Sequence, residues 1–105
     1  MIVNWSDYAQ FEFLKTLEYV EEHFGEHTRN KLFNSVSHTN DILIQQPFAG
    51  RKEPLLENDL VQYRSILVSD INRIIYYVDE ASVNVVDFWD MRRDPDFLAK
   101  RISNY

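Results

Sequence analysis

The sequence has 105 residues, a length that fits a single domain over residues 1–105 and leaves no room for a second one. Its apolar share of 45% and aromatic share of 14% are enough to build a folded core, so the composition argues against disorder. The chain has no cysteine, which excludes disulfides and thiolate metal sites. We expect no metal and no other cofactor.

The distribution of charge limits the surfaces that could bind a phosphate. The net charge is −6, whereas a protein that holds nucleic acid over a broad surface usually carries the opposite sign. Residues 1–50 hold three Lys/Arg against seven Asp/Glu, and residues 51–105 hold eight against ten. Any anion-binding surface should therefore be local and come from the second half of the chain.

The N-terminal segment lacks the basic region and the long apolar region of a signal peptide. No apolar run approaches the roughly 18 residues of a membrane span. The absence of cysteine also fits a reducing compartment. We therefore expect a cytoplasmic protein without a membrane partner.

The first half of the chain predicts a short strand and a helical hairpin. Val3–Trp5 alternates apolar and polar residues, Ser6 is a suitable helix N-cap, and Gly25 and Pro47 are natural helix ends. The predicted apolar stripe of the first helix consists of Tyr8, Phe11, Leu14, Leu17, Val20 and Phe24. The second helix, over residues 26–46, is predicted to bury Leu32, Val36 and Leu43, with a wider face that includes Phe33, Ile42 and Ile44.

The second half predicts a sheet. After a loop over residues 48–54, β-prone runs at residues 63–68, 72–78 and 83–90 are separated by short turns, which indicates an antiparallel meander. Asp94 and Pro95 then begin a short C-terminal helix that carries Phe97, Leu98 and Ile102. We expect an α+β fold in which an N-terminal strand and a helical hairpin pack on a small twisted antiparallel sheet. The first strand should join this sheet, and a place beside the last strand is one option.

Four arginines of the sheet region are candidates for phosphate binding, because the planar guanidinium group donates two hydrogen bonds at once. These are Arg64, Arg73, Arg92 and Arg93. The first two lie on neighbouring predicted strands, the last two follow the third strand, and the three positions can converge on one concave face. The competing interpretation is that each pairs with an acid that is close in sequence. The available acids are Asp70, Asp87, Asp90 and Asp94.

The helical hairpin carries polar residues with two possible interpretations. An acidic run on the first helix is either a solvated face or a surface that attracts a basic partner segment. This run consists of Glu18, Glu21, Glu22 and Glu26. The histidines of the hairpin, His23, His27 and His38, lack a second pair of ligands, so exposed helix residues are a better interpretation than a metal site.

Several segments, taken in order, resemble the RelE/ParE toxin superfamily. Val3–Ser6 with Ala9 resembles its opening strand and first helix, and Gln46–Gly50 resembles its helix end before the sheet. Tyr63–Arg64 and Asn72–Val78 resemble its "Y-R" and "Y-R-I-x-Y" strands. Asp90–Pro95 resembles the "H-G-R-R-D-P" end of ParE-like members. The match runs nearly from end to end.

The resemblance implies the toxin of a type II toxin–antitoxin module, associated with plasmid stabilisation and growth inhibition. Such toxins are neutralised by a cognate antitoxin that wraps around them. Members either cut mRNA on the ribosome or poison DNA gyrase. The resemblance assigns Arg64, Arg73 and Arg93 to phosphate contacts if the chain is an mRNA endoribonuclease. It assigns Arg92, Arg93 and Phe97 to partner binding.

Two positions depart from the pattern of the RNA-cleaving members. Ile66 stands where a second basic residue would lie, and Ala99 stands about where a late tyrosine would lie. These departures favour the ParE-like branch and gyrase as the target. The alternatives are a ribosome-dependent endoribonuclease and a non-toxic relative that only binds its antitoxin. A homodimer and a toxin–antitoxin hetero-oligomer are both compatible with the sequence.

Overall fold

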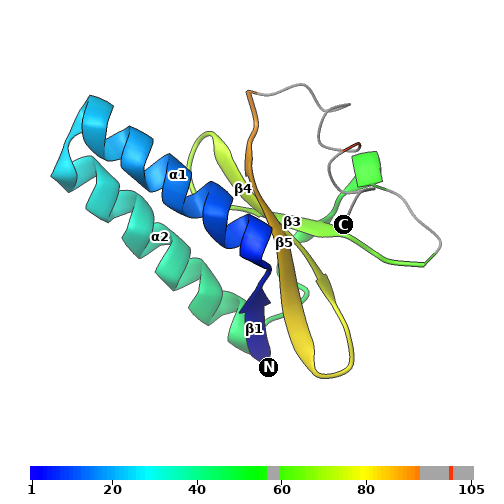
Figure 1. Ribbon diagram of the computed structural model, residues 1–105. Helices are drawn as coiled ribbons and strands as arrows, with labels where there is room; N and C mark the ends of the chain where they lie inside the picture. Colours follow the sequence, from blue (N-terminus) through cyan, green and yellow to red (C-terminus); the bar gives the residue numbers. More distant parts are fainter. Residues whose placement is uncertain (57–59, 93–99, 101–105) are drawn as a thin grey trace.

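The computed structural model describes residues 1–56, 60–92 and 100. It has two layers, with both helices on the same side of a five-stranded sheet (Figure 1). The helices are α1 (Asp7–Phe24) and α2 (Glu26–Gln45), the strands are β1 (Ile2–Trp5), β2 (Arg51–Lys52), β3 (Arg64–Leu67), β4 (Asn72–Val78) and β5 (Ser82–Asp90), and a 3-10 helix spans Pro54–Leu56. The predicted α+β class is confirmed.

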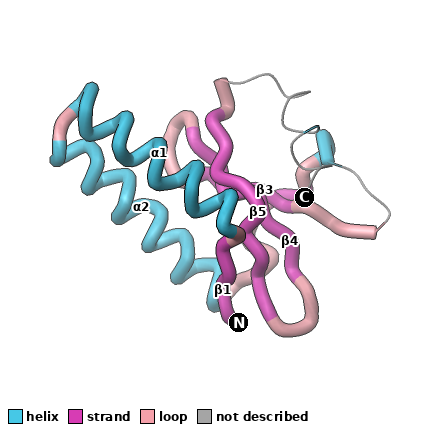
Figure 2. The backbone as a smooth tube through the Cα atoms, viewed as in Figure 1, coloured by secondary structure: helices cyan, strands magenta, loops and turns pink. Residues whose placement is uncertain are grey.

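The strand order is β1-β5-β4-β3-β2. The predicted antiparallel meander of β3, β4 and β5 is confirmed, and β1 lies beside β5 (Figure 2). However, β1 runs parallel to β5, so the sheet is mixed and not wholly antiparallel as predicted. Parallel neighbours need a long connection. Here the helical hairpin and three strands separate β1 from β5 in sequence.

The predicted loop over residues 48–54 is wrong at Arg51 and Lys52, which form the edge strand β2 and pair with β3. Both residues are exposed. A strand of two exposed residues has no alternation of buried and solvated side chains, and this alternation is the signal by which a strand is found in a sequence.

The ends of α1 agree with the predicted capping residues. The Ser6 hydroxyl accepts a hydrogen bond of 3.0 Å from the Ala9 amide, which satisfies one of the free N–H groups of the first turn. Gly25 has a φ of +90°, a conformation that glycine adopts without steric cost, and it separates α1 from α2. The helical hairpin is therefore confirmed.

The predicted apolar stripe of α1 is wrong for Phe11, Leu14 and Phe24, which are 59%, 62% and 64% exposed. The helix turns another face inward. Its buried residues are Ala9, Glu12 and Leu17, with Phe13 and Val20 partly buried. Phe11 follows Ala9 by two residues, or about 200° around the helix, so it points away from the sheet.

The buried face of α2 agrees better with the prediction. Leu32, Val36 and Leu43 are buried as expected. Phe33 and Ile44 are 49% and 44% exposed, so these two residues do not widen the core as predicted. The hairpin therefore offers apolar side chains to solvent on both of its helices.

The sheet carries a hydrophobic cluster on each face. The larger cluster packs against the hairpin and contains Ile74, Tyr76, Val83, Val85 and Phe88 from the sheet. The smaller cluster lies on the opposite face and consists of Leu56, Ile75, Val86 and Trp89. A bulge in β5 helps to divide them, because Val85 pairs with Tyr76 and Asp87 pairs with Ile75, which leaves Val86 as the extra residue.

The predicted C-terminal helix, with Asp94, Pro95, Phe97, Leu98 and Ile102, lies outside the described residues. Among the residues that the structure does describe, no helix is both long enough and apolar enough to cross a lipid bilayer.

Candidate functional site

The register of β3 and β4 decides where the predicted arginines point. Arg64 pairs with Tyr76, and Arg73 pairs with Leu67 in the same continuous ladder. Successive side chains of a strand alternate between faces. Arg64 therefore shares the hairpin face with Tyr76, whereas Arg73 lies on the opposite face with Ser65 and Ile75. The expected convergence of these arginines on one concave face is wrong.

Arg64 is held against the turn that follows α2. Its guanidinium donates a hydrogen bond of 2.9 Å to the carbonyl oxygen of Gly50 and lies 5.0 Å from the centre of the Phe48 ring. The Gly50 amide in turn donates to the Tyr76 hydroxyl at 2.8 Å. Burial is the main reason why the pKa of Tyr76 is raised, so this hydroxyl stays protonated at neutral pH. Hydrogen bonds to β3 and β4 therefore hold Gly50, the residue before β2, against the sheet.

On the opposite face, four polar residues form a connected group that we call the sheet-face cluster: Arg51, Glu53, Ser65 and Arg73. Arg73 donates to the Ser65 hydroxyl at 3.1 Å, and this hydroxyl donates to the Glu53 carboxylate at 2.8 Å. An Arg51 nitrogen lies 3.8 Å from the same carboxylate oxygen. Arg73 also donates to the sulfur of Met91 at 3.0 Å.

Burial shapes the electrostatics of the sheet-face cluster. Glu53 and Ser65 are buried, whereas the side chain of Arg51 is 61% exposed. The pKa of Arg73 is lowered, mainly by burial and then by the charge of Arg51, with Glu53 partly opposing this shift. The cluster can present the Arg51 guanidinium to an anion. Glu53, in contrast, is buried at 3% exposure, and its carboxylate already accepts a hydrogen bond from Ser65.

Sequence reasoning missed Glu53. It precedes Pro54 in a segment that is predicted to be a loop. Its hydrogen-bond donor Ser65, and Arg73 that donates to Ser65, are both distant in sequence. The signal that could have revealed it is the pairing of Arg51 with Ser65, which brings the residues after β2 beside β3. Such a pairing of two residues is not visible in a sequence.

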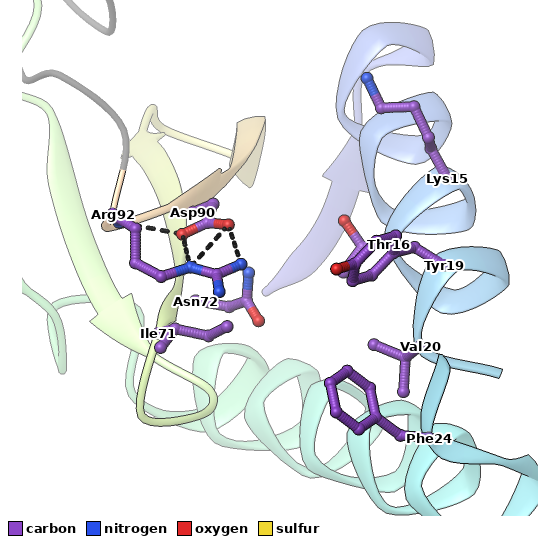
Figure 3. Close-up of a pocket in the computed structure, with 9 residues that line it drawn as sticks. All are labelled: Lys15, Thr16, Tyr19, Val20, Phe24, Ile71, Asn72, Asp90 and Arg92. Atoms are coloured by element: carbon purple, nitrogen blue, oxygen red, sulfur yellow. Dashed lines mark hydrogen bonds and ion pairs between the residues drawn. The ribbon is translucent and has the colours of Figure 1, made fainter. Parts of the chain in front are cut away.

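Arg92 lines a cavity of about 380 Å³ between α1 and the end of the sheet (Figure 3). Tyr19, Val20 and Phe24 form one wall, and Ile71 stands opposite them (Figure 3). The Arg92 guanidinium makes two-point contact with Asp90, with its shortest distance at 2.6 Å. This contact raises the pKa of Arg92, and for this arginine the predicted pairing with a local acid is confirmed.

The remaining predicted site residues, Arg93 and Phe97, lie outside the described residues, as does Ala99. Ile66 is half-buried and packs against the larger hydrophobic cluster, so this position is part of the core. Over residues 1–56, 60–92 and 100, no group of three or more histidines or acids is arranged to hold a metal ion.

No family model matches the sequence, and no curated protein matches it significantly. Solved structures, however, match the fold of this chain. A chain of the chromosomal ParDE toxin–antitoxin system of P. aeruginosa superimposes with a TM-score of 0.68 at 14% identity, over 86% of this chain and 95% of that chain. The chain has a RelE/ParE-like toxin fold. The fold that the sequence resemblance implied is therefore confirmed.

Two further structures share this RelE/ParE-like fold. The YoeB/ParE toxin of Agrobacterium tumefaciens gives a TM-score of 0.57 at 18% identity, over 86% of this chain and 98% of that chain. The YoeB dimer of Staphylococcus aureus gives a TM-score of 0.54 at 15% identity, over 83% of this chain and 92% of that chain. At these identities the likeness carries the fold, and the roles of individual residues have to be argued from this chain's own geometry.

Proposed function

We propose that the protein is the toxin of a type II toxin–antitoxin module, neutralised by a cognate antitoxin and acting on DNA gyrase. The match to the ParDE chain over 95% of that chain's length supports a toxin role, because the whole fold is shared. Fold alone does not define a target. The choice of gyrase is argued from the arginines.

The division of Arg64 and Arg73 between the two faces of the sheet is the observation that carries this choice. RNA cleavage at a 2′-hydroxyl needs cations beside the developing phosphorane charge, together with an accessible base. Two arginines on opposite faces do not share one phosphate. Arg64 is also bound to Gly50, and Arg73 is bound to Ser65 and Met91. This arrangement supports the ParE-like alternative over the nuclease.

One observation favours the endoribonuclease as a second candidate. The sheet-face cluster brings Glu53, a carboxylate, beside Arg51 and Arg73, so acid–base and cationic groups do occur together. If this were a nuclease, Arg51 and Arg73 would stabilise the phosphorane and Glu53 would accept the proton. Glu53 would first have to become accessible, since it is 3% exposed in the free protein.

The decisive experiment compares the two activities on the same purified protein. We expect micromolar protein to inhibit DNA supercoiling by gyrase, and Arg92→Ala, which removes an exposed cation, to weaken this inhibition. Arg29→Ala on α2 is the matched control. In parallel, mRNA translated in vitro should show no cuts inside ribosomal A-site codons. Such cuts, reduced by Glu53→Gln and Arg73→Ala, together with unaffected gyrase, would establish the second candidate instead.

A growth assay tests the toxin role itself. Induction of the gene should arrest bacterial growth, and co-expression of the adjacent reading frame should restore it. Absence of arrest with soluble, folded protein would support the non-toxic relative that binds only an antitoxin. Co-purification of the two proteins would identify the partner, whose helix we place beside the helical hairpin or across the sheet.

A further inference from the structure

The solvent-facing side of α1 carries two large apolar residues between acidic ones. This set, which we call the outward stripe, consists of Asp7, Phe11, Leu14, Glu18 and Glu21. Its members follow one another at intervals of four, three, four and three residues, a spacing that places them on one face of a helix. All of them are exposed. The stripe therefore has an apolar centre and acidic ends.

The fold itself does not use the outward stripe. Contacts of α1 with α2 and β5 are made by its other face, which buries Ala9 and Leu17. Lys15 lies 5.5 Å from the centre of the Phe11 ring and is paired with Glu12 at 3.3 Å, yet Phe11 remains 59% exposed. Large apolar side chains at helical spacing on an open face are the pattern by which one helix receives another.

The stripe borders a hollow between the two helices. This hollow has a volume of about 230 Å³ and is lined by Trp5, Gln10, Phe13, Leu14, Val36 and Asn40. The Trp5 indole N–H already donates to the Asn40 side chain at 3.0 Å, so the hollow offers mainly apolar edges. On α2, Phe33 is 49% exposed and stacks on Phe13 at 6.3 Å. The apolar surface thus continues from Leu14 across to α2.

The charges around this surface decide what can cover it. Asp7 lies at one end of the stripe and Glu18 and Glu21 lie at the other, with Glu22 alongside. A second copy of the chain would bring the same acids to a twofold interface, where like charges disfavour contact. A partner with Lys or Arg on either side of an apolar ridge matches both the apolar centre and the acidic ends.

We propose that the outward stripe and the adjoining hollow bind a basic amphipathic helix of a partner protein. Its apolar ridge lies on Phe11 and Leu14, and its cations face Asp7, Glu18 and Glu21. The proposal rests on the proposed function for the source of this helix, which is the antitoxin. It specifies the chemistry of that antitoxin segment as apolar and basic.

Two designed helical peptides with the same apolar ridge, one flanked by Lys and one by Glu, provide the first test. Fluorescence anisotropy with the full chain should show at least about tenfold tighter binding of the Lys peptide at low salt. The difference should shrink as salt approaches molar concentration, because screening removes the charge contribution. Equal binding of the two peptides would overturn the proposal.

Variants of the stripe provide the second test. The double variant with Phe11→Ala and Leu14→Ala should bind the Lys peptide at least about tenfold more weakly, since central apolar residues dominate such interfaces. Phe24→Ala removes an equally exposed aromatic of α1 outside the stripe and should leave binding unchanged. Glu18→Lys with Glu21→Lys should reverse the preference toward the Glu peptide. Circular dichroism checks that each variant is folded, and unchanged binding by Phe11→Ala with Leu14→Ala refutes the assignment.

The peptide tests and the growth assay can fail independently. If the protein binds the Lys peptide through the stripe but never arrests growth, the toxin role is contradicted and the proposed binding surface stands. If the protein arrests growth but shows no preference for the Lys peptide, the toxin role stands and the proposed binding surface is refuted.

Discussion

At the scale of single residues, the contacts of Gly50 explain why a glycine ends the Gln46–Gly50 segment. Its amide and its carbonyl are both bound, by Tyr76 and Arg64 respectively. A Cβ atom at this position would lie 2.6 Å from the Tyr76 hydroxyl oxygen and 2.7 Å from the Ser65 carbonyl oxygen. The glycine is therefore required by close approach to β3 and β4, since its own φ is not positive.

Gly50→Ala should destabilise the protein by roughly 1–3 kcal/mol, the usual cost of forcing an extra methyl group into a packed site. The Tyr76 side chain can shift, but the Ser65 carbonyl belongs to the backbone of β3. Urea denaturation followed by circular dichroism measures the change. Ala49→Ser, at an exposed neighbour, is the control. An unaltered midpoint for Gly50→Ala would contradict the close approach.

The polar residues of the site differ in how far the sequence predicts them. Residue type and the predicted strands are sufficient to single out the arginines. Whether Arg64 and Arg73 share a face depends on the register between β3 and β4, which a shift of one residue would reverse. No sequence pattern points to Glu53, because its contacts depend on the pairing of β2 with β3.

At the scale of elements, α1 has two sets of apolar residues, and only packing decides which one is buried. Its N-cap and its end at Gly25 are local features, so the sequence located them correctly. Apolar periodicity suggested a single stripe that joined Leu14 to Leu17. In the fold, Leu17 is 4% exposed and Leu14 is 62% exposed.

This contrast predicts opposite outcomes for two identical substitutions on α1. Leu17→Ala should cost about 2–4 kcal/mol, because it removes buried methyl groups and leaves a cavity. Leu14→Ala should change the free energy of unfolding by less than about 0.5 kcal/mol, because the side chain is already in water. Denaturant midpoints of the two variants measure the difference. A larger loss for Leu14→Ala would mean that α1 is rotated relative to the sheet.

The central strands are predicted from the sequence far better than the edge strands β1 and β2. β4 and β5 carry long runs of apolar and β-branched residues, so their positions were predicted almost to the residue. β2 has two exposed residues and was missed. The direction of β1 was missed as well, because pairing with β5 is decided by how the hairpin returns the chain to the sheet.

At the scale of the whole molecule, the two tryptophans report on different clusters. Trp5 lies 5.6 Å from Phe13 and 6.4 Å from Phe88, on the hairpin face. Trp89 is buried in the smaller cluster on the opposite face. Both clusters depend on β4, because Ile74 belongs to one and Ile75 to the other. The two faces should therefore lose their structure together.

We predict one cooperative unfolding transition. In Trp89→Phe the remaining fluorescence reports Trp5, and in Trp5→Phe it reports Trp89. Within each variant, fluorescence and circular dichroism should give the same denaturant midpoint, as expected for a small two-state domain. Separate midpoints in either variant would show that one face of the sheet unfolds before the other.

Local sequence patterns are sufficient to predict the α+β class, the order of the helices and the main strands, and the residues at which α1 begins and ends. These features follow from local periodicity and capping, which neighbouring residues specify. Long-range contacts, in contrast, set the parallel pairing of β1, the buried face of α1, the faces of Arg64 and Arg73, and the place of Glu53. These depend on strand register and on competition for a limited core, and both are properties of contacts between residues far apart in the chain.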